Sequence, residues 1–228
     1  RTGQGRKVNI NQLAKALNGA HGQAPIRSLY VYGSNPVGSV SSQAETVKGL
    51  MGQDLFTVVH ERFMTDTARY ADILLPATFS VEQSDCYLAY GYCTFGTAYK
   101  VLEPAGLCKS NWDTFRLLAG AMGYEEAYFK NTEEDMVKEL LAHPGPGLAA
   151  ASAADWNLLE SGGVISTPFA DHMDFKTETG KIMIVNPSQP EPMPRFTSAH
   201  GGDYPLRLIA VPSGYTLNSI FLAREDLN

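Results

Sequence analysis

Cysteine is scarce in this chain of 228 residues, and so are charged residues, which make up only 18% of it. The three cysteines, Cys86, Cys93 and Cys108, form no C-x-x-C pair, so they provide no thiolate set for a zinc ion or an iron–sulfur cluster. An odd number of cysteines also argues against a disulfide framework. We therefore expect three ordinary, partly buried thiols.

Basic residues and long apolar runs are lacking as well. Lys and Arg number 18 against 24 Asp and Glu, which gives a formal net charge of −6. Nucleic-acid binding relies on clustered Lys and Arg that neutralise phosphates, so no nucleic-acid partner is expected. No apolar run approaches the roughly 20 residues that span a bilayer, and no signal peptide is visible, so no direct membrane insertion is expected. Cytoplasmic and extracytoplasmic locations both stay open.

What the chain does contain is a central alternation of strands and helices. Apolar, β-prone runs predict strands at residues 26–32, 54–59 and 73–75. Helical spacing predicts helices at residues 9–17, 41–51 and 66–71, the last of them capped by Thr65. Continuously apolar strands are typical of a sheet whose faces are both covered, and short connections then favour parallel strands. The predicted fold is α/β, a parallel dinucleotide-binding-like sheet with helices on both faces.

The remaining segments are predicted to be less regular. Residues 86–99, rich in Tyr and Gly, are expected to be irregular, and residues 187–194 read as an exposed, Pro-rich linker. The other predicted elements are helices at 112–122 and 133–141, a helical turn at 155–161, a hairpin at 174–185 and a strand at 206–211. Asn111 is a candidate cap for the helix at 112–122.

The first strand ends abruptly at Gly33-Ser34-Asn35-Pro36. These residues are common turn formers, so a plain β-turn explains them. They also suit a nucleotide-contact loop, because small residues let backbone amides approach a phosphate and an asparagine amide both donates and accepts hydrogen bonds. The loop is neither a Walker motif nor a G-x-G-x-x-G fingerprint, so an ordinary ATP or NAD site is not expected. The residues alone leave both interpretations open.

His60 and Glu61 follow the second predicted strand, at the sheet edge where such folds bind ligands. A carboxylate there can accept hydrogen bonds from a ribose diol, although a solvated loop pair is the simpler interpretation. Asn111 likewise has two interpretations, as a helix cap or as a ligand contact. The sequence has no H-E-x-x-H motif and no convincing Ser/His/Asp set, so no catalytic residue and no metal ligand is predicted.

Taken together, several segments resemble the third domain of molybdopterin oxidoreductases, the dimethyl-sulfoxide-reductase superfamily. They are "LYVYGSNP", "FTVVHERFMTDTARYADILLPAT", "VEQSDCYLAYG", "VLEPAGLCKSNWDTFRLLAGAMG" and "FKTETGKIMIV", in the family's order and spacing. The segment "YPLRLIAVPSGYTLNSIF" resembles the opening of the family's C-terminal cofactor-binding domain. The resemblance implies a cofactor-binding α/β domain at residues 1–170. Residues 171–228 would hold a hairpin, a Pro-rich linker and the truncated start of a mainly β C-terminal domain.

In this family molybdenum, sometimes tungsten, is held by two molybdopterin guanine dinucleotides, and the third domain cradles one guanine nucleotide tail. Asn35 matches the family's loop amide, and the pair His60-Glu61 matches the polar residues near the ribose or guanine. Asn111 stands where the family often has Asp, which puts a charge-assisted guanine contact in doubt. The cofactor contacts implied by the resemblance are Gly33, Ser34, Asn35, Pro36, His60, Glu61, Thr65, Gln83, Asn111, Pro212, Ser213, Gly214, Tyr215, Asn218 and Ser219.

The resemblance also implies what lies elsewhere. The chain opens at Arg1 rather than Met, so we expect a fragment whose parent carries the metal ligand and an iron–sulfur cluster upstream. Its expected partners are the remaining domains and an iron–sulfur electron-transfer subunit, and the fragment alone should be inactive.

Comparison of residues 82–87 with the family's members indicates which reaction the parent catalyses. They lack the E-G-R ending frequent in formate dehydrogenases and nitrate reductases, and favour a sulfoxide-type anaerobic reductase or oxotransferase. A formate dehydrogenase or nitrate reductase, a non-catalytic respiratory-complex scaffold, and a nucleotide-binding module for GTP or NAD remain as alternatives.

Overall fold

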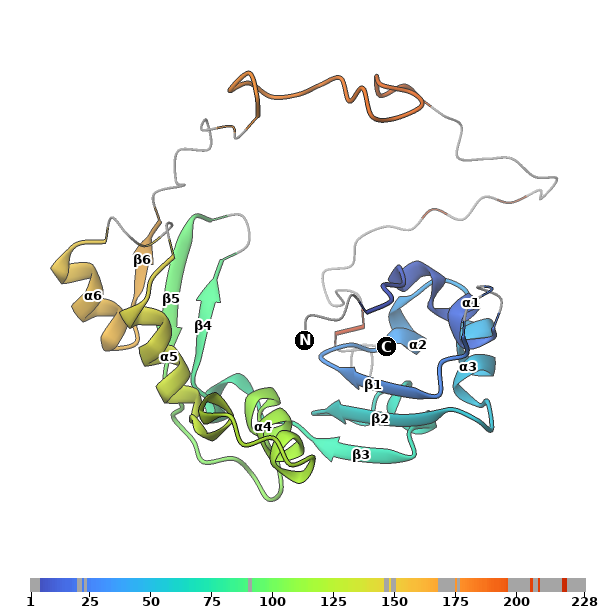
Figure 1. Cartoon of the computed structure of the whole chain (residues 1–228), viewed down its shortest axis with the longest axis horizontal. Helices are drawn as coiled ribbons and strands as arrows, with labels where there is room; N and C mark the ends of the chain where they lie inside the picture. The colour runs from blue at the N-terminus through green and yellow to red at the C-terminus, as the bar shows by residue number, and fades with distance from the viewer. Residues whose placement is uncertain are drawn as a thin grey trace. The chain divides into compact units, whose positions relative to one another are not determined.

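The structure, a computed structural model, describes residues 5–19, 22, 24–89, 92–145, 148, 151–167, 175, 177–196, 206, 209 and 219–220. The chain divides into two compact units (Figure 1). Unit 1 comprises Arg1–Asp85, Tyr99–Met136 and Pro212–Asn228, and unit 2 comprises Cys86–Ala98 and Val137–Val211. The boundary predicted between residues 170 and 171 lies outside the described residues and stays a prediction.

Unit 1 is built on a parallel three-stranded sheet in the order β1-β2-β3, as Figure 1 shows. Its strands are β1 (Ser28–Tyr32), β2 (Phe56–Glu61) and β3 (Ile73–Pro76). The register pairs Tyr32 with His60, and Glu61 with Pro76, so the three carboxyl ends meet at one edge. The predicted α/β fold with a parallel sheet is thereby confirmed.

The two faces of this sheet carry different side chains, because residues paired across parallel strands share a face. Val31 and Val59 form a buried cluster with Ala68 on one face. On the other face, Phe115 packs against Tyr30, with ring centroids 5.2 Å apart, and α4 (Asn111–Ala121) is held against β1. Aromatic pairs at this separation add to the free energy gained by burying their area.

The helices around the first two strands largely follow the sequence prediction. They are η1 (Ile10–Gln12), α1 (Leu13–Leu17), α2 (Pro36–Ser39) and α3 (Gln43–Leu50). Helices α1 and α3 touch at Gly49, where a Cβ atom would lie 2.5 Å from Leu17 Cβ. The Asn18 amide nitrogen joins the two helices by donating to the carbonyls of Ala14 and Glu45, at 2.8 Å each.

The helix predicted at 66–71 is only a short 3₁₀ turn, η2 (Ala68–Tyr70). The N-cap residue of this turn is Thr67, so the predicted cap at Thr65 is wrong, although Thr65 Oγ1 accepts a hydrogen bond from the Ala68 amide at 3.3 Å. The turn stops because Ala71 is already extended, with ψ at 141°, and the chain enters β3 two residues later. The short connection leaves no room for a longer helix.

After β3 the chain leaves unit 1 at Asp85 and re-enters it at Tyr99, through a neck formed by residues 79–84 and 100–105. Glu82, at the end of η3 (Ser80–Glu82), accepts hydrogen bonds from the amides of Phe79 (2.8 Å) and Ala105 (3.0 Å). The Ser84 hydroxyl accepts one from the Lys100 amide at 3.1 Å. The contacts with Ala105 and Lys100 join the outgoing segment of the neck to the returning one.

Unit 2 contains β4 (Asp85–Leu88), β5 (Thr94–Ala98) and β6 (Val164–Ser166), in that order, and β5 pairs antiparallel with β6. The prediction that residues 86–99 are irregular is therefore wrong. Glycine weakens a strand signal, but Gly96 is needed here, because a Cβ atom would lie 2.9 Å from Val164 Cγ2. Phe95 beside it enters a core with Leu159 and Ile165.

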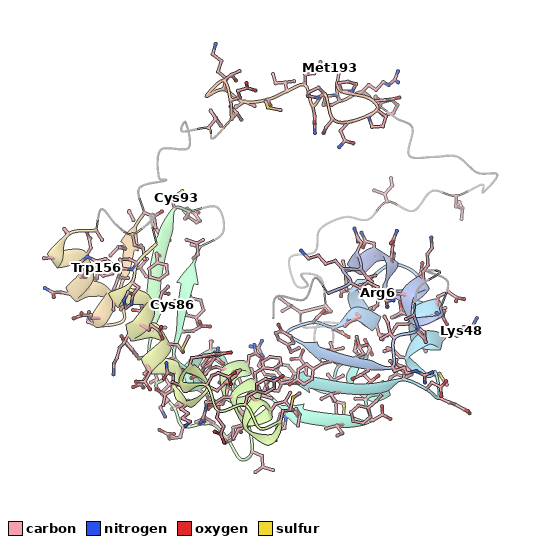
Figure 2. All side chains as sticks on the ribbon, viewed as in Figure 1. Arg6, Lys48, Cys86, Cys93, Trp156 and Met193 are labelled. Carbon is pink, nitrogen blue, oxygen red and sulfur yellow. The ribbon has the colours of Figure 1, made fainter. Side chains whose placement is uncertain are left out.

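The remaining helices are η4 (Ala127–Lys130), α5 (Glu133–Ala142) and α6 (Ala153–Glu160). Helix α6 begins with a capping box, in which Ser152 and Asp155 each accept a hydrogen bond from the other's backbone amide. The three cysteines are partly buried and none is in a disulfide, as predicted. Figure 2 places Cys93 toward the tip of the β4–β5 hairpin and Cys86 nearer its base.

The predicted hairpin at 174–185 is wrong for the residues that the structure describes there. Thr177 and Lys181 close a turn around Gly180, whose φ is 65°, but no strand forms. The β-prone residues 182–185 are exposed, since no described strand pairs with them and propensity alone does not make a ladder. The segment 187–194 is exposed, as predicted. Of the predicted strand at 206–211 only Leu206 and Ile209 are described, and neither lies in a strand.

Candidate functional site

The carboxyl edge of the unit 1 sheet is organised by the side chain of Asn35. Its Oδ1 accepts hydrogen bonds from the Thr67 hydroxyl (2.7 Å) and the Thr67 amide (3.2 Å). Thr67 Oγ1 in turn accepts a hydrogen bond from the Val37 amide at 3.0 Å. Asn35 is 7% exposed and Thr67 is fully buried. This buried network locks the loop that follows β1 to the loop that follows β2.

The backbone around Asn35 is shaped by two glycines. Gly33 turns the chain out of β1 in the left-handed region, with φ at 57°, where other residues are strained. A Cβ atom at Gly38 would lie 2.6 Å from Asn35 Nδ2 and 3.4 Å from Ser219 Cβ. The fold thus brings the predicted residue Ser219 to the Asn35 loop. The other predicted residues of that segment, Pro212, Ser213, Gly214, Tyr215 and Asn218, lie outside the described residues.

Asn35 therefore uses its two amide atoms differently. Oδ1 is engaged inside the protein, whereas no described residue accepts a hydrogen bond from Nδ2. Ser34 beside it is exposed, and Pro36 is the first residue of the short helix α2. The β-turn interpretation and the ligand-contact interpretation are thus compatible, since the turn holds the amide in place.

His60 lies within β2 and is only 1% exposed, so the solvated-loop interpretation is wrong for it. Its Nε2 is 3.0 Å from the carbonyl oxygen of Lys109. Its Nδ1 is buried and has no hydrogen-bond partner among the described residues. The contact that the structure gives His60 is with the main chain, and its predicted cofactor contact stays a prediction.

Glu61 ends β2 at the same edge. Its Oε1 accepts a hydrogen bond from the Arg62 amide at 2.8 Å, and Arg62 Nε lies 4.0 Å away. The carboxylate side chain is 15% exposed, so it is sheltered yet reachable. A carboxylate in this position can accept hydrogen bonds from hydroxyl groups of a ligand.

Gln83 and Asn111 lie on segments beyond β3. Gln83 Oε1 accepts a hydrogen bond from the Thr78 hydroxyl at 2.7 Å. The predicted cap role of Asn111 is wrong, because Ser110 is the cap of α4 and accepts a hydrogen bond from the Asp113 amide at 3.1 Å. Asn111 is instead the first residue of α4, and its exposed side chain has no partner among the described residues.

The structure also shows residues that the sequence did not single out. Thr67, which completes the Asn35 network, lies in the quoted T-D-T-A run, but nothing local marks its partner 32 residues away. Lys109 acts through its main chain, which no side-chain pattern reveals. Ser110 could have been found, because a serine that precedes a helix by one residue is a preferred cap.

Three further observations bear on the chemistry of the described residues. Burial raises the pKa of the Tyr30 phenol above its ordinary 10.0, and the neighbouring Tyr32 adds to the shift. Among the described residues no three His, Cys, Asp or Glu side chains gather as a metal site requires. Within the same residues no helix is long and apolar enough to cross a membrane. The site offers hydrogen-bonding groups for an organic ligand.

The family of the chain follows from comparison with known proteins. The family model for molybdopterin oxidoreductases matches residues 3–121, which include β1, β2, β3 and most of α4. The chain belongs to the molybdopterin oxidoreductase family. Membership implies a molybdopterin cofactor and its metal.

Individual relatives agree with this assignment. YoaE, a candidate oxidoreductase of Bacillus subtilis, is 35% identical over 233 residues, which cover 96% of this chain and 33% of that protein. Acetylene hydratase of Syntrophotalea acetylenica is 36% identical over 105 residues, 46% of this chain and 14% of that protein. A candidate formate dehydrogenase of Staphylococcus haemolyticus is 28% identical over 171 residues, 73% of this chain and 17% of that protein. The chain thus spans a third or less of the length of these relatives.

A solved structure supports the fold. Acetylene hydratase from Pelobacter acetylenicus superposes with a TM-score of 0.59 at 23% identity, over 76% of this chain and 23% of that one. This likeness shows the fold alone.

The described residues fit the organic part of a molybdopterin cofactor. Gly38 lets the Asn35 amide keep its position, since a Cβ atom there would lie 2.6 Å from Nδ2, and Asn35 Nδ2 has no acceptor among the described residues. Asn111 presents a second exposed amide. Neutral amides and a carboxylate suit hydroxyl, phosphate and base groups, and a metal would need ligands from elsewhere.

Proposed function

We propose that this chain holds the guanine nucleotide end of a molybdopterin guanine dinucleotide at the carboxyl edge of the β1-β2-β3 sheet. The observation that carries the proposal is the buried network between Asn35 and Thr67. It fixes one face of the Asn35 amide by two hydrogen bonds, 2.7 and 3.2 Å long, and leaves Nδ2 without a described acceptor. Ligands of parallel α/β sheets bind at this edge.

Each polar group has a chemically suitable role in this proposal. Asn35 Nδ2 donates to a phosphate or ribose oxygen, and the sheltered Glu61 carboxylate accepts from ribose hydroxyls. Asn111 pairs through its amide with the base, as a neutral replacement for a carboxylate. Gln83 and Ser219 lie on segments that contact this edge, through Thr78 and Gly38 respectively. The cofactor supplies the redox chemistry when bound, and these residues bind and orient it.

We further propose that the protein is a molybdenum or tungsten oxidoreductase with two such dinucleotides, of the sulfoxide reductase or oxotransferase type. Residues 82–87, E-Q-S-D-C-Y, favour that type because they lack the E-G-R ending. Formate oxidation is the second candidate, and the similarity to a candidate formate dehydrogenase favours it. The metal ligand, the iron–sulfur cluster and an electron-transfer subunit are proposed to lie outside this chain.

The first test is the composition of the protein isolated anaerobically from its own host. Two dinucleotides bound to one metal predict about two acid-released guanine nucleotides per molybdenum or tungsten atom. Sulfoxide reduction and formate oxidation are then assayed side by side. A protein that lacks both guanine and metal, from a host shown to make the cofactor, would overturn the proposal and favour a scaffold.

A variant then locates the site. Asn35→Asp keeps the Oδ1 acceptor for Thr67 but replaces the Nδ2 donor with a negative charge that repels phosphate. Guanine retention should fall about tenfold or more, since 1.4 kcal/mol is a factor of ten in affinity. The matched control is Asn157→Asp, the same change at an exposed position of α6 in unit 2, which should leave retention unchanged. Equal retention in both variants would refute the role of Asn35.

A further inference from the structure

The buried ring of His60 holds a main-chain segment that enters unit 1 from a distant part of the sequence. Its Nε2 donates to the Lys109 carbonyl oxygen, 3.0 Å away and 49 residues later. Because a carbonyl only accepts, Nε2 carries the ring proton in this contact. Nδ1 remains buried without a described partner, so the Nε2 contact is the single polar tie of this side chain in the described part of the chain.

Lys109 is bound on its other side as well. Its carbonyl also accepts a hydrogen bond from the Thr78 amide at 3.2 Å, and its amide donates to the Pro76 carbonyl at 3.0 Å. Ala77 and Lys109 thereby form a parallel β-bridge next to the end of β3. Lys109 is thus fixed between the residues at the end of β3 and the ring of His60 on the neighbouring strand β2.

The next two residues transmit this placement to α4. Ser110 is buried and caps α4, and Asn111 is its first residue. Adjacent Cα atoms are about 3.8 Å apart, so Asn111 cannot move far unless Lys109 moves too. One turn further along, Phe115 packs against Tyr32 with ring centroids 5.3 Å apart. Helix α4 is therefore held by its aromatic contact and, at its start, by the β-bridge of Lys109 together with the hydrogen bond from His60.

We infer that His60 is a positioning residue that sets the location of the Asn111 amide relative to the carboxyl edge of the sheet. This inference rests on the proposed guanine site and deepens it. An amide reads a base only when its atoms lie within about 0.5 Å of the right geometry, so a loose helix start weakens the contact even though α4 remains folded. His60 then acts through Lys109 and Ser110, without touching the cofactor.

The test is a double-mutant cycle in the complete protein purified from its host. His60→Leu removes the Nε2 donor, and Asn111→Ala removes the amide that it positions. We expect each single variant to lose guanine nucleotide about tenfold faster than the wild type in a mild denaturant challenge, and the double variant to match Asn111→Ala. Additive losses in the double variant would overturn the positioning role.

Two controls separate positioning from general stability. Val59→Ala creates a cavity at a fully buried neighbour on β2, on the opposite face, and should lower thermal stability without changing guanine retention relative to metal. His60→Gln places an amide donor near the position of Nε2 and should restore retention, whereas the shorter His60→Asn should not.

The outcomes also separate this inference from the proposed function. A wild-type protein that contains no guanine nucleotide would refute both the proposed function and the positioning role of His60. Guanine in the wild type, together with additive losses or with equal retention in the Gln and Asn variants, ends the positioning role alone. Should His60→Leu fail to accumulate, the comparison of Gln with Asn decides.

Discussion

Thr67→Val is the sharpest test of the network at the sheet edge, because valine keeps the shape of threonine and removes only its hydroxyl. That hydroxyl donates to Asn35 Oδ1 over 2.7 Å and accepts from the Val37 amide over 3.0 Å, at a fully buried residue. A lost hydrogen bond costs about 0.5–1.5 kcal/mol, and an orphaned buried amide about 1–3 kcal/mol. The local opening free energy should therefore fall by about 1.5–4.5 kcal/mol.

Hydrogen–deuterium exchange of the intact protein measures this loss directly. At 1.4 kcal/mol per factor of ten, amide exchange of the Val37 segment should accelerate about 10- to 1,600-fold. Thr67→Ser is the matched control, because it keeps both hydrogen bonds and loses one buried methyl group, worth about 0.8 kcal/mol or a fourfold change. Equal exchange rates in the Val and Ser variants would refute the hydrogen-bond network as the lock between the two loops.

Three further predictions concern single residues of unit 1. Thr57→Val should leave the thermal midpoint unchanged or raise it, because the buried Thr57 hydroxyl has no partner in the described part of the chain and its burial costs about 1–3 kcal/mol; a fall of several degrees would contradict this. The raised pKa of the Tyr30 phenol contributes stability that is present below the ordinary pKa of 10.0 and is lost as the pH rises through the pKa of the folded protein. The urea midpoint should therefore shift less between about pH 8 and about pH 11 in Tyr30→Phe than in the wild type. Equal shifts in the two proteins would contradict this prediction. Gly38→Ala puts a Cβ atom 2.6 Å from Asn35 Nδ2 and should lower guanine retention, and unchanged retention would show that this amide is not the contact.

Much of the sheet could be predicted from the sequence because its signals are local. Strands β1, β2 and β3 are short β-prone runs with short connections, which predicted their parallel pairing but not their register. Gly96 misled the prediction for β5, since the glycine that lowers strand propensity is the one that lets Val164 approach. Residues 182–185 show the reverse error, with strong β propensity and no described strand to pair with. In both cases the presence or absence of a distant strand to pair with decided whether the segment formed a strand.

The loop of the candidate site could be predicted from the sequence, but the residues that hold its side chains in place could not. Asn35 stands out because a strand ends in small residues, but its Oδ1 partner comes from another loop. His60 was expected to be a loop residue because the predicted strand stopped one residue earlier, and a histidine there suggests contact with solvent. Its burial depends on Lys109, 49 residues later, through an atom that every residue possesses. Contacts made by main-chain atoms leave no trace in a side-chain pattern.

The neck at Glu82 and Ser84 means that unit 1 is discontinuous along the chain. During synthesis the sheet β1-β2-β3 emerges first, but the Lys109 segment and α4 follow only after the β4–β5 hairpin has been made. His60 is therefore left without its Nε2 acceptor, and Glu82 without the Ala105 amide, for that interval. The face of the sheet that α4 covers stays uncovered until about fifty further residues have left the ribosome, which takes a few seconds at ordinary elongation rates. Chaperone contact or premature collapse should therefore concentrate on the face of the sheet that α4 later covers.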